Sequence, residues 1–225
     1  MSDYQLINRS YVLPTPAGAF YVAGSRTDDP AKQLLVALMS AEQSPLLSVP
    51  QACKWSGLKN QDEVLELLYR IQDLGWIQGE EETRFAPAGA LEDILPSLLA
   101  SVSSSGKALL ADDHGFYLAR HGYTHETAEE LSALSADLLA LHKRHRGLLN
   151  NNMSLHSEAW SIVDAAGNSK LGFWPLHVGE HHFVLALSGV PQLNQLAFVE
   201  LIWVLNKRYN LMSHANVSPM RSDVG

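Results

Sequence analysis

Residues 108–120, ALLADDHGFYLAR, carry the clearest local structural signal in the chain. Two short apolar runs flank a turn that is made of Asp112, Asp113, His114 and Gly115. Aspartate bonds to the backbone that follows it and glycine tolerates a positive φ, so this composition is typical of a tight turn between strands. The stretch predicts a β-hairpin, and we interpret the two aspartates as turn formers rather than as a catalytic carboxylate pair.

A long helix is predicted directly after this hairpin, over residues 125–146. It begins with glutamates and ends with Lys143, Arg144 and Arg146, which matches the helix dipole at both ends. Hydrophobic periodicity and turn-forming residues predict two further helices, at 91–102 and 192–209. They also predict three strands, at 158–163, 170–177 and 182–188. Because the last helix is apolar around the full turn, we expect it to be buried on nearly all sides.

The order of these elements resembles the roadblock/dynein-light-chain family. The resemblance rests on the hairpin at 108–120 and on the Ala/Leu-rich pattern AEELSALSADLLAL within residues 127–141, and it covers roughly half of the chain. It implies a roadblock-type α/β sandwich with a five-stranded antiparallel sheet. It also implies homodimerisation and a role as a platform or regulator for small Ras-like GTPases. Its motifs encode a fold and no catalytic signature.

The N-terminal half predicts a different small fold. Strand-like runs at 11–13 and 19–22, separated by prolines and Gly18, predict a β-hairpin. Three helices are then predicted over about 30–42, 49–55 and 61–74, with Asp29, Ser48 and Asn60 as their N-caps. Runs at 76–78 and 83–85 predict a ribbon-like wing, and this order is typical of a winged helix-turn-helix.

A chain of 225 residues is long enough for two small domains. We therefore expect an α+β protein with three parts. These are a winged-helix-like domain with an N-terminal hairpin at 1–88, a roadblock-like domain at 89–212 and a loose C-terminal tail at 213–225.

Composition narrows the functional classes. Hydrophobic residues make up 46% of the chain and charged residues 18%, which is typical of a globular protein. Cys53 is the single cysteine, which excludes an internal disulfide, and the start lacks the profile of a secretory signal, so we expect a cytoplasmic protein. No apolar run approaches the roughly 20 residues that cross a bilayer, and we expect no membrane role.

The third predicted helix and the wing decide between two functions. A winged helix invites the hypothesis of a DNA-binding transcriptional regulator, but the formal net charge of -8 opposes binding to phosphates. Between residues 60 and 82, Arg70 is the single basic residue. The acidic residues there form a possible partner-facing surface: Asp62, Glu63, Glu66, Asp73, Glu80, Glu81 and Glu82. This balance favours a protein-docking module over DNA binding.

No pattern in the sequence predicts catalysis, a cofactor or a metal site. Histidine pairs occur at 121 and 125, at 142 and 145, and at 181 and 182, but without a cysteine pair or an HExxH motif. Ser105, Gly106 and Lys107 look like the end of a phosphate-binding loop, yet Ser101 and Ala108 stand where that loop requires a glycine and a hydroxyl. We expect a non-enzymatic protein that binds no nucleotide itself.

The long helix at 125–146 predicts the dimer interface. At about 100° per residue, Leu131, Leu134, Leu138 and Leu141 form a stripe suited to covering the sheet. A row of small residues lies opposite, and small residues let a second helix approach closely. The predicted interface consists of Glu129, Ser132, Ala136, Ala140 and Lys143, with Glu129 of one subunit facing Lys143 of the other across a two-fold axis near Ala136. The alternative is that these alanines simply favour helix and face water or the winged-helix-like domain.

Overall fold

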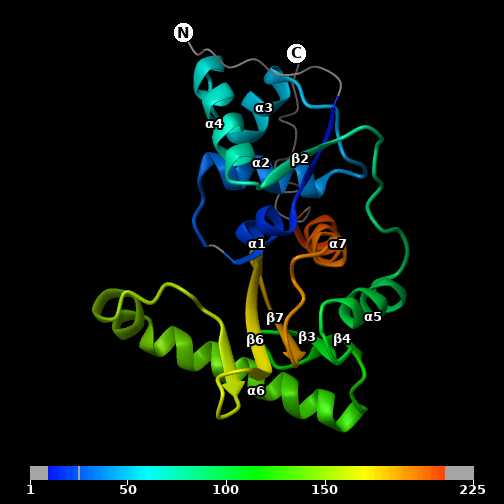
Figure 1. Cartoon of the computed structure of the whole chain (residues 1–225), viewed down its shortest axis with the longest axis vertical. Helices are drawn as coiled ribbons and strands as arrows, with labels where there is room; N and C mark the ends of the chain where they lie inside the picture. The colour runs from blue at the N-terminus through cyan, green and yellow to red at the C-terminus, as the bar shows by residue number, and fades with distance from the viewer. Residues whose placement is uncertain (1–9, 25, 211–225) are drawn as a thin grey trace, which may run out of the picture.

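The structure is a computed structural model that describes residues 10–24 and 26–210 (Figure 1). The predicted tail at 213–225 lies outside the described residues.

An antiparallel sheet of five strands in the order β4-β3-β7-β6-β5 forms the centre of the C-terminal half, as predicted. Its strands are β3 (Ala108–Asp112), β4 (Tyr117–His121), β5 (Trp160–Val163), β6 (Ser169–Val178) and β7 (His181–Ser188). The hairpin turn between β3 and β4 forms as its residues predict. Asp112 Oδ1 accepts hydrogen bonds from the backbone N–H groups of His114 at 3.0 Å and Phe116 at 2.8 Å, and Gly115 has a φ of 89°.

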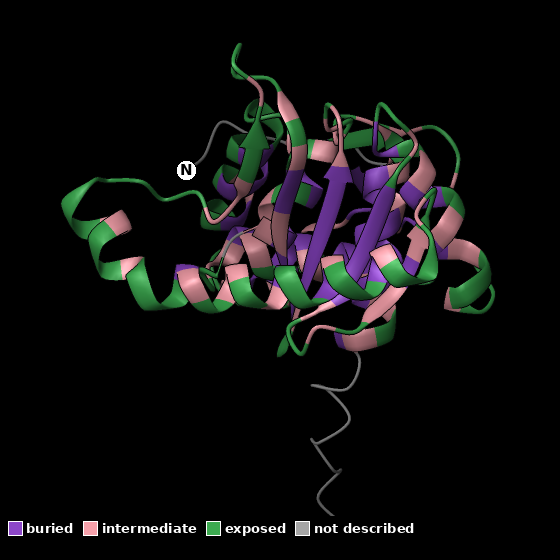
Figure 2. Cartoon of the chain, turned by 90° about the horizontal axis from the view of Figure 1, so that it is seen from below, coloured by how far each residue is buried: buried purple, intermediate pink, exposed green. Residues whose placement is uncertain are grey.

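Helices cover both faces of this sheet (Figures 1 and 2). The long helix α6 (His125–Arg146) crosses one face and packs over Leu109, Phe173 and Val184. The opposite face is covered by α5 (Leu91–Ser101) and α7 (Leu196–Leu205), whose apolar side chains join the main hydrophobic cluster.

The three predicted helices of the N-terminal half are confirmed. They are α2 (Pro30–Ser40), α3 (Val49–Ser56) and α4 (Gln61–Asp73). Each begins at the predicted cap, because side-chain oxygens of Asp29, Ser48 and Asn60 accept hydrogen bonds from the first free backbone N–H groups.

The predicted hairpin between residues 11–13 and 19–22 is wrong. The second run belongs to a helix, α1 (Pro16–Gly24), which begins with the Thr15 hydroxyl accepting from Gly18 N at 3.2 Å and with proline in its first turn. A Cβ on Gly18 would lie 2.1 Å from the Trp76 carbonyl oxygen, so glycine is needed for this helix to pass close to the backbone at Trp76.

The predicted ribbon between residues 76–78 and 83–85 is also wrong. Strand β2 (Ile77–Glu80) pairs with β1 (Tyr11–Pro14), while Phe85 forms an isolated bridge with Gln43. Strand β1 offers buried Val12 and Leu13, whereas Arg84 and Phe85 are exposed, and this difference in burial favours the observed pairing.

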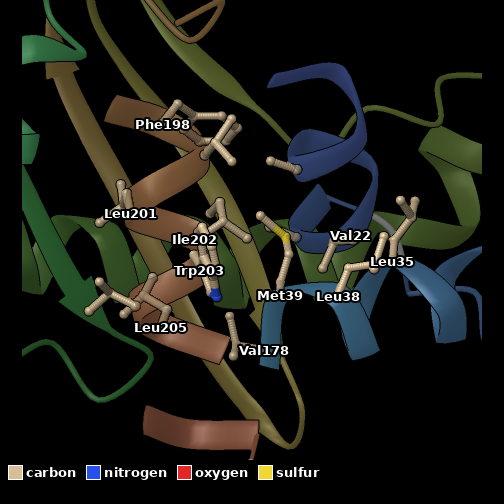
Figure 3. Close-up of a cluster of buried hydrophobic side chains, with 14 of the residues drawn as sticks. Val22, Leu35, Leu38, Met39, Val178, Phe198, Leu201, Ile202, Trp203 and Leu205 are labelled. Atoms are coloured by element: carbon tan, nitrogen blue, oxygen red, sulfur yellow. The ribbon is translucent and has the colours of Figure 1, made fainter. Parts of the chain in front are cut away.

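Helix α7 joins the two halves of the chain (Figure 3). Its predicted burial is confirmed, since Phe198, Leu201, Ile202 and Leu205 are all buried. The Trp203 indole donates to the Ala41 carbonyl oxygen at 2.8 Å, and Val22 and Met39 pack in the same cluster. The helix begins at Leu196 rather than at residue 192. One hydrophobic cluster therefore runs from the N-terminal helices to the sheet.

Candidate interaction surfaces

The face that α6 turns to the sheet agrees with the prediction only in part, because Leu131 and Leu138 of the predicted stripe pack against the cluster over the strands. Ala128, Ser132 and Ser135 are fully buried, whereas Leu134 of the predicted leucine stripe is 38% exposed. Ser132 donates its hydroxyl to the Ala128 carbonyl oxygen at 2.7 Å, within its own helix. The sheet already supplies bulky side chains beneath this helix, so small residues let the helix approach it closely. Ser132 is thus buried within its own subunit and cannot contact a second copy.

The other four residues of the predicted interface lie away from the most buried face of α6. Glu129 is exposed, and its Oε1 lies 3.5 Å from Nε2 of His125. Ala136 is half-buried, and both Ala140 and Lys143 are exposed.

Strand β5 leaves one edge of the sheet open. It pairs with β6 on one side, and no described segment pairs with its other side. At the opposite edge β4 also has no described strand beyond it, and α5 contacts this strand and β3. Ile162 is 56% exposed and Val163 is 54% exposed, so β5 presents apolar side chains together with unpaired backbone groups.

A protruding segment connects α6 to β5, and we call residues 147–157 the arm. It begins with a π-helical turn, η1 (Gly147–Asn152), and projects from the body of the molecule (Figures 1 and 2). Leu148 is 50% exposed, Met153 is 55% exposed and Leu155 is 49% exposed. The arm therefore carries apolar surface that the described chain does not cover.

Charged groups meet at Glu158, directly after the arm. Its Oε1 lies 3.2 Å from Arg26 Nε and 3.4 Å from an Arg146 guanidinium nitrogen. Its Oε2 accepts a hydrogen bond from His177 Nε2 at 3.0 Å. Arg26 precedes α2, Arg146 ends α6 and His177 lies on β6, so the Glu158 cluster ties three separate elements to the base of the arm.

The electrostatics of the Glu158 cluster keep its carboxylate ionised. The hydrogen bond from His177 and the charge of Arg26 lower the pKa of Glu158 to about 2, although burial acts in the opposite direction. His142 lies beside this group, and burial lowers its pKa despite the nearby carboxylate. Its Nδ1 accepts from Trp160 Nε1 at 3.3 Å, which is consistent with a neutral imidazole.

Sequence reasoning missed the Glu158 cluster. Its members come from distant parts of the chain, and no local spacing joins residues 26, 146, 158 and 177. The pairing of β6 with β7 also sets His177 opposite His182, with their Nδ1 atoms 3.1 Å apart. That pairing depends on a register that only the folded sheet defines.

The predicted acidic surface is exposed on α4 and in the turn after β2. Asp62, Glu63, Glu66, Asp73, Glu81 and Glu82 are exposed, and Glu80 is half-buried and lies 3.8 Å from Arg84 Nε. Tyr69 and Leu74 are also exposed on or beside α4, at about half of their surface. On and beside α4, the surface therefore combines carboxylates with two large apolar side chains and with exposed Arg70.

Within residues 10–24 and 26–210, no three histidine, cysteine, aspartate or glutamate side chains are arranged to hold a metal ion. Ser105 and Gly106 belong to the stretch that looks like the end of a phosphate-binding loop. There, the hydroxyls of Ser103 and Ser105 donate hydrogen bonds to the Ser188 carbonyl oxygen, at 2.7 Å and 3.0 Å. Over the same described range, every helix is too short or too polar to cross a bilayer.

Comparison of the sequence with protein-family models and with curated proteins gives no match. Among solved structures, the chain is similar to a Roadblock/LC7 domain from Streptomyces avermitilis, with 16% identity, a TM-score of 0.39, and coverage of 55% of this chain and 99% of that one. It is similar to Myxococcus xanthus MglB, with 16% identity, a TM-score of 0.32, and coverage of 53% and 90%. It is also similar to the gliding protein MglB of Thermus thermophilus, with 19% identity, a TM-score of 0.32, and coverage of 55% and 93%.

Proposed function

We propose that this protein is a non-catalytic, homodimeric interaction module of the cytoplasm, in which a second copy adds to the sheet at β5. The open edge of β5 carries the proposal, because unpaired backbone groups beside exposed Ile162 and Val163 form a template for another strand. A two-fold axis at this edge would pair β5 with its own counterpart and continue the sheet across both subunits.

The contact between Trp160 and His142 indicates which part of α6 would meet the second copy. Trp160 begins β5, so the open edge lies near His142, towards the C-terminal end of α6. In an edge-to-edge dimer the two α6 helices overlap near Ala140 and Lys143, while Glu129 lies farther away. The competing arrangement is the antiparallel pairing centred on Ala136, in which Glu129 meets Lys143.

We expect light scattering after size exclusion to report a dimer for the native chain, and carbodiimide coupling to distinguish the two arrangements. Glu129 and Lys143 lie about 21 Å apart along one helix, at about 1.5 Å per residue, so a zero-length bond between them forms only between subunits. The edge-to-edge dimer predicts no such bond and a dimeric Ala136→Arg variant. The Ala136-centred dimer predicts the bond and a monomeric variant. A native monomer would contradict both.

For the partner we propose a small Ras-like GTPase, the class that the family resemblance implies, and we propose that it docks on the acidic surface. Carboxylates around exposed Tyr69 and Leu74 suit a partner face that is basic with an apolar centre.

Titration of the chain with a panel of small Ras-like GTPases, loaded with GDP or GTP, is therefore expected to show binding that weakens with salt. Combined Glu66→Lys and Asp73→Lys changes should lower that affinity by about tenfold or more. The matched control is Glu92→Lys with Asp93→Lys, two exposed acids on α5, which should leave the affinity unchanged. Equal binding by both variants would exclude the acidic surface as the docking site.

The alternative of a DNA-binding regulator is less favourable. Helix α4 would present exposed carboxylates to the phosphates of a duplex, with net repulsion. Salt-sensitive retention of the purified chain on random duplex DNA would support that alternative instead.

A further inference from the structure

The arm exposes apolar surface in an unusual position. Leu148, Met153 and Leu155 stand on a segment that projects away from the core, where each is about half exposed. Exposed apolar side chains that gather on one projection mark a contact surface more often than scattered ones do.

Hydrogen bonds and an ion pair brace the arm. The backbone N–H of Met153 donates to the Leu148 carbonyl oxygen at 3.1 Å, and that of Leu155 donates to the Leu149 carbonyl oxygen at 2.9 Å. Arg146 on one side of the arm is bound to Glu158 on the other side. Such contacts reduce the conformational entropy that the arm would lose on binding a partner.

The position of the arm indicates what it meets. Helix α6 continues past the open edge of the sheet, and the arm projects beyond that edge (Figures 1 and 2). A second copy that adds its β5 to this edge would bring its own α6 beneath the arm.

The outward surface of α6 is complementary to the arm. It carries Leu134, which is 38% exposed, together with the exposed carboxylates of Glu130 and Asp137. The base of the arm carries exposed Arg144 and His145 beside its apolar side chains. Apolar groups can therefore meet apolar groups while cations meet carboxylates.

We propose that the arm is a clasp, which closes over α6 of a second copy and packs Leu148, Met153 and Leu155 around that copy's Leu134. The clasp rests on the proposed edge-to-edge dimer. Two arms act in each dimer because of the two-fold symmetry, so the clasp strengthens the dimer twice and slows exchange of subunits.

The first test measures the dimer dissociation constant by sedimentation. Combined Leu148→Ser, Met153→Ser and Leu155→Ser changes should raise the Kd by about 30-fold or more, because the buried apolar area is lost at both arms. The matched control is Leu74→Ser, Phe85→Ser and Val190→Ser, at side chains that are 51%, 67% and 57% exposed elsewhere. It should change the Kd by less than about threefold. Circular dichroism should remain unchanged in both variants.

The second test locates the arm, in a Cys53→Ser background. One copy carries Leu155→Cys and the other Leu134→Cys, so a short bismaleimide can join these positions only between subunits. Efficient cross-linking is expected for this mixture, and little for a mixture of Leu155→Cys with Val190→Cys. A native dimer with no cross-link, or with an unchanged Kd in the arm variant, overturns the clasp and leaves the dimer intact. A native monomer overturns both.

Discussion

Replacing Ile162 and Val163 with lysine is expected to convert the proposed dimer into a folded monomer. Both side chains stand on β5, at the open edge of the sheet. Lysine at an edge strand opposes edge-to-edge pairing, because two copies related by a two-fold axis would bring like charges close to each other on each face of the continued sheet. The expected rise in the dimer Kd is about 100-fold or more.

Size exclusion with light scattering measures this result directly. The side chains are more than half exposed, so the fold itself should be retained and the thermal unfolding temperature should change little. Leu74→Lys with Val190→Lys is the matched control, since it adds the same charge at similarly exposed positions and should remain dimeric. If light scattering gave the β5 variant the same dimeric mass as the control and the native chain, the β5 edge of the sheet would not be the dimer interface.

The Glu158→Gln variant is expected to lose about 2 to 3 kcal/mol of unfolding free energy at neutral pH. The pKa of Glu158 is about 2 in the folded state, against 4.5 ordinarily, and this shift corresponds to a loss of unfolding free energy somewhat larger than that range. We reduce it because Arg26 and Arg146 are partly exposed to solvent, which screens their charge. The amide of glutamine leaves both guanidinium groups without their shared carboxylate.

The pH dependence has a defined sign. The folded-state pKa of Glu158 is depressed, so its contribution is fully present above about 4.5 and is lost as the pH falls through about 2. His142 acts in the same direction. Its folded-state pKa lies below 6.5, so the unfolded chain takes up the proton first and stability falls as the solution becomes more acidic. The loss between pH 4.5 and 2 should be smaller in Glu158→Gln than in the native chain.

Urea unfolding at a series of pH values provides the measurement. Glu42→Gln is the control, because Glu42 is 82% exposed and pairs with Lys207 at the surface, where a salt bridge contributes less than about 1 kcal/mol. Equal losses in the two variants would show that the Glu158 cluster stabilises the fold no more than a surface ion pair does.

The helices and the sheet could largely be predicted because their signals are local. Asp29, Ser48 and Asn60 mark helix starts within a few residues, and the Asp112 turn fixes the first hairpin of the sheet. Helix α1 was missed because Phe20, Tyr21 and Val22 are typical of a strand. Tertiary contacts with β6 and α7 favour a helix at that position instead.

The interaction surfaces could be predicted only in part. The acidic surface follows from composition, so its exposure was foreseeable. The sheet-facing side of α6 was foreseeable in part, since Leu131 and Leu138 pack on the cluster as predicted, whereas the buried Ser132 and Ser135 have no apolar signal. The Glu158 cluster depends on four segments that only the complete fold brings together.

The burial of most of α7 between the two halves of this chain leads us to expect that they unfold as a single cooperative unit. A fragment that begins at α5 would expose the surface around Phe198 and Ile202 that α1 and α2 cover in the whole chain. Such a fragment would be prone to aggregate. Loss of the N-terminal half during evolution would therefore require polar residues to replace the newly exposed apolar side chains of α7 at the same time. The two halves are therefore expected to be inherited together.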